Sequence, residues 1–325
     1  MEKIKVAFIY KPSDKFLSRD YFDNTTYYFF MKALGRNDKL DVSYFSEEKE
    51  IDVVPLEKYF DVILISGNHS FHTPELKGIE NLKIPVVSRT GDFHFAKRYN
   101  TFDFHEKFKI DYYFNFMDKN YFYKFYPKDF KYKTIVFGIE PDQYDDNSQF
   151  KNRIKNQIIN SGALGNSSLK SRMFNRIMNP KRTGWYFYKL RTMCNNLSYV
   201  IHARKIAETY KNKSYIQLLS KYQASITATT HYPTLKYLES TAAGCLTFME
   251  ITEENNGKYL GFEDGKTSIF INEKNYEEKF KEYLNSTNDP KWEEIARRGR
   301  EFTLTKFSND TAVKSLVSLL EKAIS

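Results

Sequence analysis

The stretch PTLKYLESTAAGCLTFME, residues 233–250, changes from a helical pattern to a strand pattern. At about 100° per residue, Leu235, Leu238 and Ala242 lie on one stripe of a helix that ends in Gly-Cys and runs into an apolar strand. Glu239 projects about 40° from Leu235, at the edge of this buried face. A carboxylate there costs free energy unless a neighbouring cation, a backbone amide or a ligand bonds to it. The stretch therefore predicts a helix–strand unit with a candidate binding residue, Glu239.

The rest of the chain repeats this alternation of strand and helix. In the first half, strands are expected at 4–10, 40–45, 60–68, 84–92, 111–116 and 133–141, with a helix at 25–36. After a polar, turn-rich segment at 138–149, strands are expected at 155–163, 197–203, 224–230 and 266–272, and helices at 168–178, 213–222, 276–285 and 292–307. The segment 180–196 fits no regular pattern. Strand–helix alternation is typical of doubly wound parallel sheets, which bind ligands at the carboxyl ends of their strands.

The predicted fold class is therefore α/β, with two Rossmann-like doubly wound domains. The N-terminal domain is expected at 1–140 and the C-terminal domain at 141–307. A last helix, 308–325, is capped by Ser308 and is expected to pack back on the N-terminal domain.

The composition limits the class of protein. Apolar residues make up 41% of the 325 residues and charged residues 28%, and no run of about 18 apolar residues is present. The N-terminus MEKIKVAFIY lacks the long apolar core of a signal peptide, and two cysteines exclude a disulfide scaffold and a cysteine-based zinc site. We expect a cytoplasmic protein that associates peripherally with a membrane surface. The net charge of +9 indicates an anionic partner: nucleic acid, anionic lipid or a phosphorylated small molecule. A lysine-rich proteome would give the same excess.

Aromatic residues alternate with lysines in IDYYFNFMDKNYFYKFYPKDFKY, residues 110–132. Such interleaving suits stacking on single-stranded nucleic acid or on sugars. It also suits core aromatics flanked by lysines whose aliphatic stems lie along them. The second interpretation is favoured.

Several segments of the second half occur in a known order. LESTAAGCLTFME, FEDGKTSIFIN, YEEKFKEYLN and WEEIARRGREF, with GIEPDQY at the linker, resemble the nucleotide-binding half of nucleotide-sugar glycosyltransferases with the GT-B fold. The resemblance covers about 138–320 and is closest to the "glycosyl transferases group 1" and CgeB-like type. It implies an acceptor-binding N-terminal domain that faces a donor-binding C-terminal domain across a cleft. It also implies a metal-independent hexosyltransferase with a UDP- or GDP-linked sugar as co-substrate and no further cofactor.

The resemblance also assigns donor-binding residues. Glu239 matches the glutamate that accepts from the ribose hydroxyls, and Arg172 matches an arginine that binds phosphate, with Arg176 as its rival. The amides of Thr234 and Leu235, at a helix start, are candidates for the diphosphate. The remaining candidates are Gly162 and Gly165, which allow close approach of the backbone, His202 near the expected base-binding loop around Ile206 and Ala207, and His231, where many retaining members have a glutamate.

An inverting transferase needs a general base that deprotonates the acceptor hydroxyl. The segments GNHSFH (67–72) and SRTGDFH (88–94) follow predicted strands, so their side chains face the expected cleft. Asp92 is the preferred base and His69 the second, with His72 and His94 nearby. Asp92 as a helix cap and the histidines as plain loop residues are the alternatives, and a retaining enzyme needs no such base.

The predicted function is sugar transfer from a nucleotide donor to a hydroxyl of a glycan or lipid acceptor, with an anionic membrane surface as a further partner. No Asp-x-Asp stands in a fitting loop, so no metal site is predicted. Nucleic-acid binding through 110–132 and a non-catalytic nucleotide-binding relative remain as alternatives. The sequence leaves open the sugar, the acceptor and the anomeric outcome.

Overall fold

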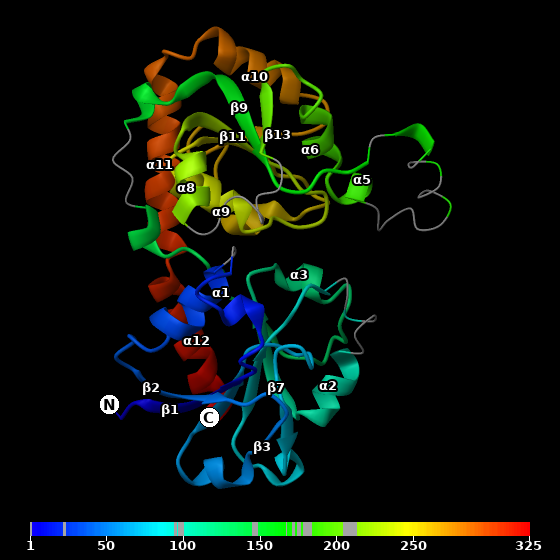
Figure 1. Cartoon of the computed structure of the whole chain (residues 1–325), viewed down its shortest axis with the longest axis vertical. Coiled ribbons are helices and arrows are strands. Elements are labelled where there is room, and N and C mark those ends of the chain that lie inside the picture. Colours follow the sequence, from blue (N-terminus) through cyan, green and yellow to red (C-terminus); the bar gives the residue numbers. More distant parts are fainter. Residues whose placement is uncertain are drawn as a thin grey trace. The chain divides into compact units, whose positions relative to one another are not determined.

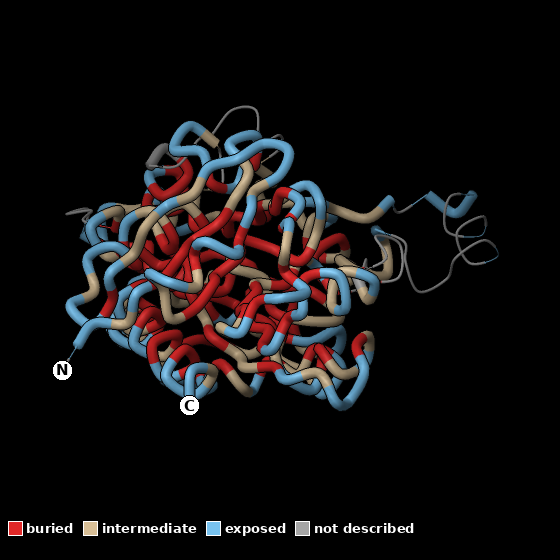
Figure 2. Tube along the Cα trace, turned by 90° about the horizontal axis from the view of Figure 1, so that it is seen from below, coloured by how far each residue is buried: buried red, intermediate tan, exposed pale blue. Residues whose placement is uncertain are grey.

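The computed structural model describes residues 2–21, 24–93, 96, 101–144, 149–166, 168–170, 173, 177, 184–203 and 213–325. The chain divides into two compact units, each built on its own parallel sheet (Figure 1). Unit 1 comprises Met1–Gly138 and Ser308–Ser325, and unit 2 comprises Ile139–Phe307. The sequence placed these divisions after residues 140 and 307. Buried residues, red in Figure 2, lie within a layer of half-buried and exposed ones.

Unit 1 contains a six-stranded parallel sheet with the order β2-β1-β4-β6-β7-β8. Its strands are β1 (Ile4–Tyr10), β2 (Leu40–Ser46), β4 (Val62–Ile65), β6 (Val86–Arg89), β7 (Ile110–Asn115) and β8 (Tyr132–Thr134). A separate pair consists of β3 (Glu50–Asp52) and β5 (Glu75–Lys77). The chain leaves β1 toward β2 and returns to β4 on its other side, so strand order reverses between β1 and β4. In doubly wound sheets this is where ligands bind.

The helices of unit 1 are short except for the last. They are α1 (Thr25–Tyr27), which continues as a π-helix over Tyr28–Ala33, then α2 (Thr101–Lys107), α3 (Lys119–Phe122) and α12 (Asn309–Ile324). Ser308 caps α12 by accepting from the Thr311 amide. Val313, Leu316 and Leu320 of α12 pack into the same core as the β-strand residues Val6 and Leu64. The C-terminal helix is therefore part of unit 1.

Unit 2 contains a five-stranded parallel sheet with the order β10-β9-β11-β12-β13. Its strands are β9 (Ile154–Ser161), β10 (Val200–Ala203), β11 (Tyr222–Thr227), β12 (Leu246–Glu250) and β13 (Ile269–Ile271). Among its described helices are α5 (Gly184–Phe187), α6 (Lys189–Cys194), α8 (Lys213–Leu219), α9 (Lys236–Ala242), α10 (Tyr276–Asn285) and α11 (Pro290–Lys306). The segment 180–196, which no sequence pattern explained, thus holds α5 and α6. The predicted α/β class with two Rossmann-like units is confirmed.

The opening stretch folds as helix α9 followed by β12. Leu238 and Ala242 of α9 are buried, whereas Leu235 at the helix N-cap and Glu239 are half-buried. Gly244 has φ +76°, which lets the chain turn from the helix into the strand without the strain that a Cβ would cause there. The predicted position of Glu239 at the edge of the buried face is correct.

The aromatic–lysine segment 110–132 lies in the core of unit 1. Tyr113, Phe114 and Phe122 are fully buried, and Phe122 stacks on Tyr126 with ring centroids 4.3 Å apart. Lysine ammonium groups lie over the outer rings, such as Lys131 at 4.9 Å from the Tyr112 centroid. Buried rings cannot stack on bases, so the preferred interpretation of this segment is confirmed. Among the described residues, no helix has both the length and the apolar character needed to cross a membrane.

Candidate functional site

In unit 2, two cationic side chains meet at Gly162, the residue that follows β9. Gly162 has φ +104°, and a Cβ added there would lie 2.9 Å from both Arg191 Nη1 and Lys236 Cε. Only glycine combines this backbone conformation with so close an approach of two side chains. Arg191 comes from α6 and Lys236 from the start of α9, so three elements converge at the carboxyl end of β9. This is the edge at which a doubly wound sheet binds its ligand.

Arg191 is the least satisfied of these groups. It is 2% exposed and donates from Nη1 to the Ala163 carbonyl at 3.4 Å, while its guanidinium carbon lies 5.0 Å from the Tyr188 ring centroid. Its Nε and Nη2 have no hydrogen-bond partner within the described part of the chain. Burial lowers the pKa of Arg191, yet a guanidinium keeps its charge in proteins. A buried cation whose Nε and Nη2 are unbonded is destabilising by itself, and an anion that bonded to them would offset this cost.

Lys236 is held in place by a short chain of hydrogen bonds. Its Nζ donates to the Tyr215 hydroxyl at 3.2 Å, and that hydroxyl lies 2.8 Å from Ser161 Oγ at the end of β9. Burial raises the pKa of Tyr215, so the phenol is neutral at pH 7. Burial opposes the charged form of Lys236, but its interactions with the Tyr215 hydroxyl and the Glu239 carboxylate outweigh burial and raise the pKa of the ammonium. Lys236 therefore carries a fixed positive charge next to Gly162.

Glu239 lies one helical turn after Lys236 on α9 and is half-buried. Its charge raises the pKa of both Lys236 and Tyr215, which places it in the same cluster. Leu235 is the N-cap of α9, and the α9 amides that follow Lys236 are bonded back to Thr234 and Leu235 carbonyls. The amides of Thr234 and Leu235 make no backbone hydrogen bond within the described chain. The sequence-predicted residues Gly162, Glu239, Thr234 and Leu235 are thus brought together.

The two donor-site histidines lie in different surroundings. His202, half-buried at the end of β10, has Nε2 3.0 Å from the Gly162 carbonyl, so it fixes the glycine loop. His231 packs between the rings of Tyr186 and Phe187, each with its centroid 4.8 Å away, and its Nδ1 lies 3.7 Å from Glu254 Oε1. His202 therefore helps to shape the loop that contains Gly162. Its proposed position near the nucleobase of a donor stays a prediction.

Of the other predicted residues, Gly165 has a role in packing and five lie outside the described residues. A Cβ on Gly165 would lie 2.3 Å from Trp185 Cα, so this glycine allows the loop to pack against α5. Arg172 and Arg176 lie outside the described residues, as do His94, Ile206 and Ala207. The call on Arg172 therefore stays a prediction, and Arg191 is a buried cation that the structure does describe in this unit.

Glu250, at the end of β12, is a buried carboxyl group in the same unit. It is 6% exposed, and its Oε2 has no hydrogen-bond partner among the described groups. Burial first, and then the neighbouring Glu273, raise the pKa of Glu250 to about 7, although Arg191 favours its charged form. Within the described ranges, no three His, Cys, Asp or Glu side chains form a group that could hold a metal ion.

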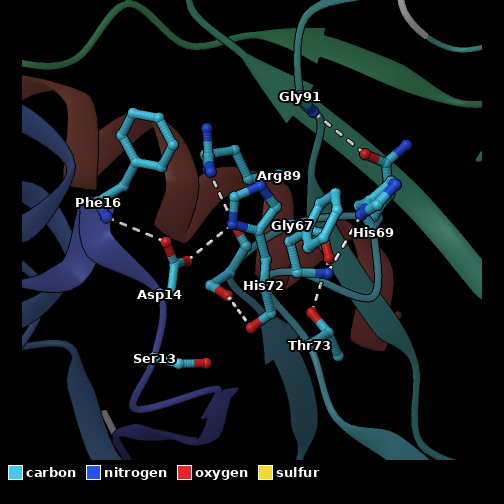
Figure 3. A network of polar contacts seen from close by, with 12 residues as sticks. Ser13, Asp14, Phe16, Gly67, His69, His72, Thr73, Arg89 and Gly91 are labelled. Atoms are coloured by element: carbon cyan, nitrogen blue, oxygen red, sulfur yellow. Dashed lines mark hydrogen bonds and ion pairs between the residues drawn. The ribbon is translucent and has the colours of Figure 1, made fainter. Parts of the chain in front are cut away.

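In unit 1, polar side chains lie close together in the segments that follow β1, β4 and β6 (Figure 3). Asp14 Oδ2 lies 2.9 Å from His72 Nδ1, and Asp14 is 4% exposed. Asn68 is buried, accepts from the Gly91 amide at 3.1 Å and donates to the Tyr126 hydroxyl at 3.0 Å. These bonds tie the loops after β4 and β6 to the aromatic core and make the edge of the sheet rigid.

The two predicted bases differ in setting. His69 is half-buried, stacks on Phe71 and accepts from the Phe71 amide through Nδ1 at 3.1 Å. Burial first, and then His72, lower the pKa of His69, so its imidazole is neutral at pH 7. Asp92 is exposed, three residues after β6. Sequence reasoning named His72 only as a neighbour and did not name Asp14, Arg191 or Lys236 as site residues.

The comparisons with known proteins agree with this architecture. Residues 182–318, which contain Arg191, Lys236 and Glu239, match the family described as glycosyl transferase-like. No curated protein matches the chain. The chain is similar to the solved structure of HepE from Anabaena in complex with UDP and glucose, with 11% identity, a TM-score of 0.55 and coverage of 98% of this chain and 100% of that one.

Two further solved structures show the same fold. A glycosyltransferase from Rickettsia africae is 11% identical with a TM-score of 0.59, and the similarity covers 100% of both chains. Sucrose-phosphate synthase from Thermosynechococcus elongatus is 10% identical with a TM-score of 0.60, covering 98% of this chain and 99% of that one. The chain therefore has the fold of GT-B glycosyltransferases, as the resemblance implied.

Proposed function

We propose that the chain is a glycosyltransferase that moves a sugar from a nucleoside-diphosphate donor to a hydroxyl acceptor. The observation that carries the proposal is the convergence of Arg191 and Lys236 on Gly162, at the carboxyl end of β9. Both cations lie in the segment 182–318 that matches glycosyl transferase-like proteins. A diphosphate carries the two or more negative charges that this pair would neutralise.

The other residues of the cluster suit the remaining parts of such a donor. The half-buried Glu239 carboxylate accepts from the two ribose hydroxyls, as acidic residues do in dinucleotide sites. The amides of Thr234 and Leu235 add donors for the phosphate oxygens. His231, packed against the rings of Tyr186 and Phe187, lies within reach of the sugar in this proposal. UDP and glucose occupy the HepE structure, so a UDP-linked hexose is the proposed donor.

We also propose that the enzyme needs no metal ion and that it is of the CgeB-like subtype. Two fixed side-chain cations balance the charge of the departing diphosphate, which is the role a divalent ion has in metal-dependent transferases. Arg191 supplies the N–H groups of Nε and Nη2, which have no partner among the described residues, and Lys236 supplies a charge held by Tyr215. The reaction then needs no cofactor besides the sugar donor.

The distribution of charge supports docking on an anionic membrane surface. Residues 147–207 contain 12 Lys or Arg and no Asp or Glu, whereas the remaining chain has 38 basic and 41 acidic residues. The whole positive excess therefore belongs to this segment. It also carries Leu169, Met173 and Ile177, which are 74%, 67% and 80% exposed at a spacing of four residues. Exposed apolar residues in a basic segment are typical of peripheral attachment to anionic lipid. A lipid-linked or glycan acceptor is consistent with that location.

The nucleotide class is tested by thermal shift of the wild-type protein with UDP, GDP, ADP and CMP. A ligand that binds only the folded state raises the free energy of unfolding, by about 2.7 kcal/mol at a ligand concentration a hundredfold above its Kd. The melting temperature rises as a result. We expect UDP to give the largest shift and Lys236→Met to abolish it. Lys266→Met, which removes an exposed lysine paired with Glu263 in the same unit, is the control. Equal, negligible shifts with all four nucleotides would contradict the proposal, and UDP-glucose turnover separates an enzyme from a non-catalytic relative.

A further inference from the structure

Three aromatic rings of unit 1 stack in a column that has Phe71 at its exposed end. The Phe71 ring lies 4.4 Å from the His69 imidazole, measured between centroids, at an interplanar angle of 21°. His69 lies 5.9 Å from Phe104 of α2 at 7°, and Phe104 meets the buried Phe108 edge-on at 4.9 Å. The Phe71 amide also donates to His69 Nδ1 at 3.1 Å. Phe71 is nevertheless 65% exposed, so the column holds an apolar ring at the surface.

A second exposed ring, Phe16, lies at the same edge of the unit 1 sheet. Phe16 follows β1 and is 38% exposed, and its ring centroid is 6.0 Å from that of His72, in the segment after β4 that also holds Phe71. The two segments are tied together, because the Lys11 amide donates to the His72 carbonyl at 2.9 Å and Asp14 Oδ2 lies 2.9 Å from His72 Nδ1 (Figure 3). Strand order reverses between β1 and β4. Both exposed rings therefore lie where a doubly wound sheet binds its ligands.

The segments that carry these rings have little charge. Residues 66–73, SGNHSFHT, contain no Lys, Arg, Asp or Glu, and residues 11–18 contain two lysines and one aspartate. Burial first, and then His72, lower the pKa of His69, so the imidazole behind Phe71 is neutral at pH 7. Sites for single-stranded nucleic acid combine stacking rings with a positively charged groove, and anionic lipid is attracted by clustered Lys or Arg. The low charge here favours a neutral ligand over both.

A hexopyranose ring fits such a surface. The C–H groups on one face of the sugar carry a partial positive charge, which the negative face of an aromatic ring attracts. The sugar hydroxyls need polar partners around that contact, and the exposed Ser70 and Lys15 lie next to Phe71 and Phe16 in the chain. A ring that is already held by stacking loses little conformational freedom when a ligand binds. Phe71 is therefore preorganised for contact with a flat, neutral and polar-edged ligand.

We infer that Phe71 is a stacking site for a sugar ring of a neutral oligosaccharide, with His69 as its positioning residue and Phe16 as a second ring at the same edge. The inference rests on the proposed function and names the class of its hydroxyl acceptor, a neutral glycan. All of these residues belong to unit 1, so the binding step can be measured without a nucleotide donor.

The test uses the full chain, fluorescently labelled, on a printed array of neutral hexose and N-acetylhexosamine oligosaccharides. The oligosaccharide that gives the strongest signal is then titrated calorimetrically. We expect Phe71→Ala to weaken its binding by about tenfold or more, as the loss of one stacked ring implies. Tyr59→Ala is the matched control, because Tyr59 is 60% exposed in the same unit and should leave the affinity unchanged. An unaltered melting temperature shows that each variant is folded.

Conservative variants separate stacking from a merely structural role. Phe71→Trp should retain the affinity, and its emission should shift to shorter wavelength as the sugar covers the indole, beyond the background that Trp185 and Trp292 give in the wild type. His69→Ala removes the ring behind Phe71 and should weaken binding, whereas His69→Phe keeps a ring there and should restore it.

Three results would overturn the inference: a wild-type protein that binds no neutral oligosaccharide on the array, wild-type affinity in Phe71→Ala, and a Phe71→Ala change that abolishes binding to oligothymidylate or to phosphatidylglycerol vesicles instead. These outcomes are distinct from failure of the proposed function. A UDP shift without glycan binding removes only the acceptor site, and glycan binding without any nucleotide shift removes the transferase and leaves a glycan-binding protein.

Discussion

Lys236 donates a hydrogen bond to the hydroxyl of Tyr215 at 3.2 Å, with its Nζ 4.6 Å from the centroid of the same ring. The lysine is therefore oriented before any ligand binds, since Tyr215 is itself bonded to Ser161. Arg191 on the other side of Gly162 differs, because its Nε and Nη2 have no partner in the described chain. One cation of the pair is preorganised and the other is held at a free-energy cost that an anionic ligand would offset.

This difference predicts the behaviour of Arg191→Met. Replacement of a buried, incompletely bonded cation by an apolar side chain of similar length is often neutral or stabilising. Loss of hydrogen bonds to a charged ligand costs about 1.5–3 kcal/mol each, a factor of roughly 10 to 150 in affinity. We therefore expect at least tenfold weaker UDP binding by calorimetry, without a lower melting temperature in the absence of ligand. Arg297→Met, on the exposed face of α11, should leave UDP affinity unchanged. Wild-type affinity in Arg191→Met would remove this residue from the site.

The ribose role of Glu239 can be isolated by a double comparison of protein and ligand. If its carboxylate accepts from the ribose hydroxyls, wild-type protein should bind UDP more tightly than 2′-deoxy-UDP, by about tenfold for one charge-assisted hydrogen bond. Glu239→Gln should weaken UDP binding and bring the two ligands to nearly equal affinity. Titration calorimetry with both ligands on both proteins gives the coupling energy directly. A preference for UDP that survives in Glu239→Gln would mean that another group reads the 2′-hydroxyl.

Residues with local signals were predictable from the sequence. Strands β1 and β4 are short apolar runs, the helix expected at 276–285 agrees with α10, and Glu239 lies at a distinctive angle on a helical stripe. The shared cause is that periodicity and turn residues act over a few positions along the chain.

Residues without local signals were missed. Arg191 lies in a segment whose helices α5 and α6 have four and six residues, too short for a periodic pattern. Asp14 and His72 are 58 residues apart and meet because β1 and β4 are neighbours in the sheet. Lys236 was foreseen only as a neighbouring cation that could pair with Glu239, since its hydrogen-bond partner Tyr215 lies 21 positions away. Burial and long-range pairing of polar groups depend on topology, which a single sequence does not display.

Glu250 predicts a specific dependence of stability on pH. Its pKa is raised from 4.5 to about 7 in the folded chain, chiefly by burial. Between these values the folded state holds a proton that the unfolded state has released, so stability falls as pH rises from about 4.5 to about 7. The contribution is on the order of 3 kcal/mol. We expect Glu250→Gln to lose this slope, as measured by the urea midpoint of unit 2 at pH 5, 6, 7 and 8. Glu278→Gln changes an exposed residue of α10 and should keep the wild-type slope. If Glu250→Gln also kept the wild-type slope, the carboxyl group of Glu250 would not be the cause of the pH dependence.

Attachment to anionic lipid is expected to depend on both the apolar residues and the basic segment around them. Leu169, Met173 and Ile177 expose apolar side chains that would insert at the boundary of the headgroups, while the basic residues of 147–207 that lie near the surface would each attract anionic lipid by about 1 kcal/mol. Sedimentation with phosphatidylglycerol vesicles should therefore recover the wild-type protein, and recovery should fall with added salt. The triple change of these three residues to aspartate should abolish recovery and leave the UDP shift intact. Val54→Asp, at an exposed apolar position of unit 1, is the control. Equal binding of the triple variant, or equal binding to neutral phosphatidylcholine vesicles, would contradict a combined apolar and electrostatic attachment.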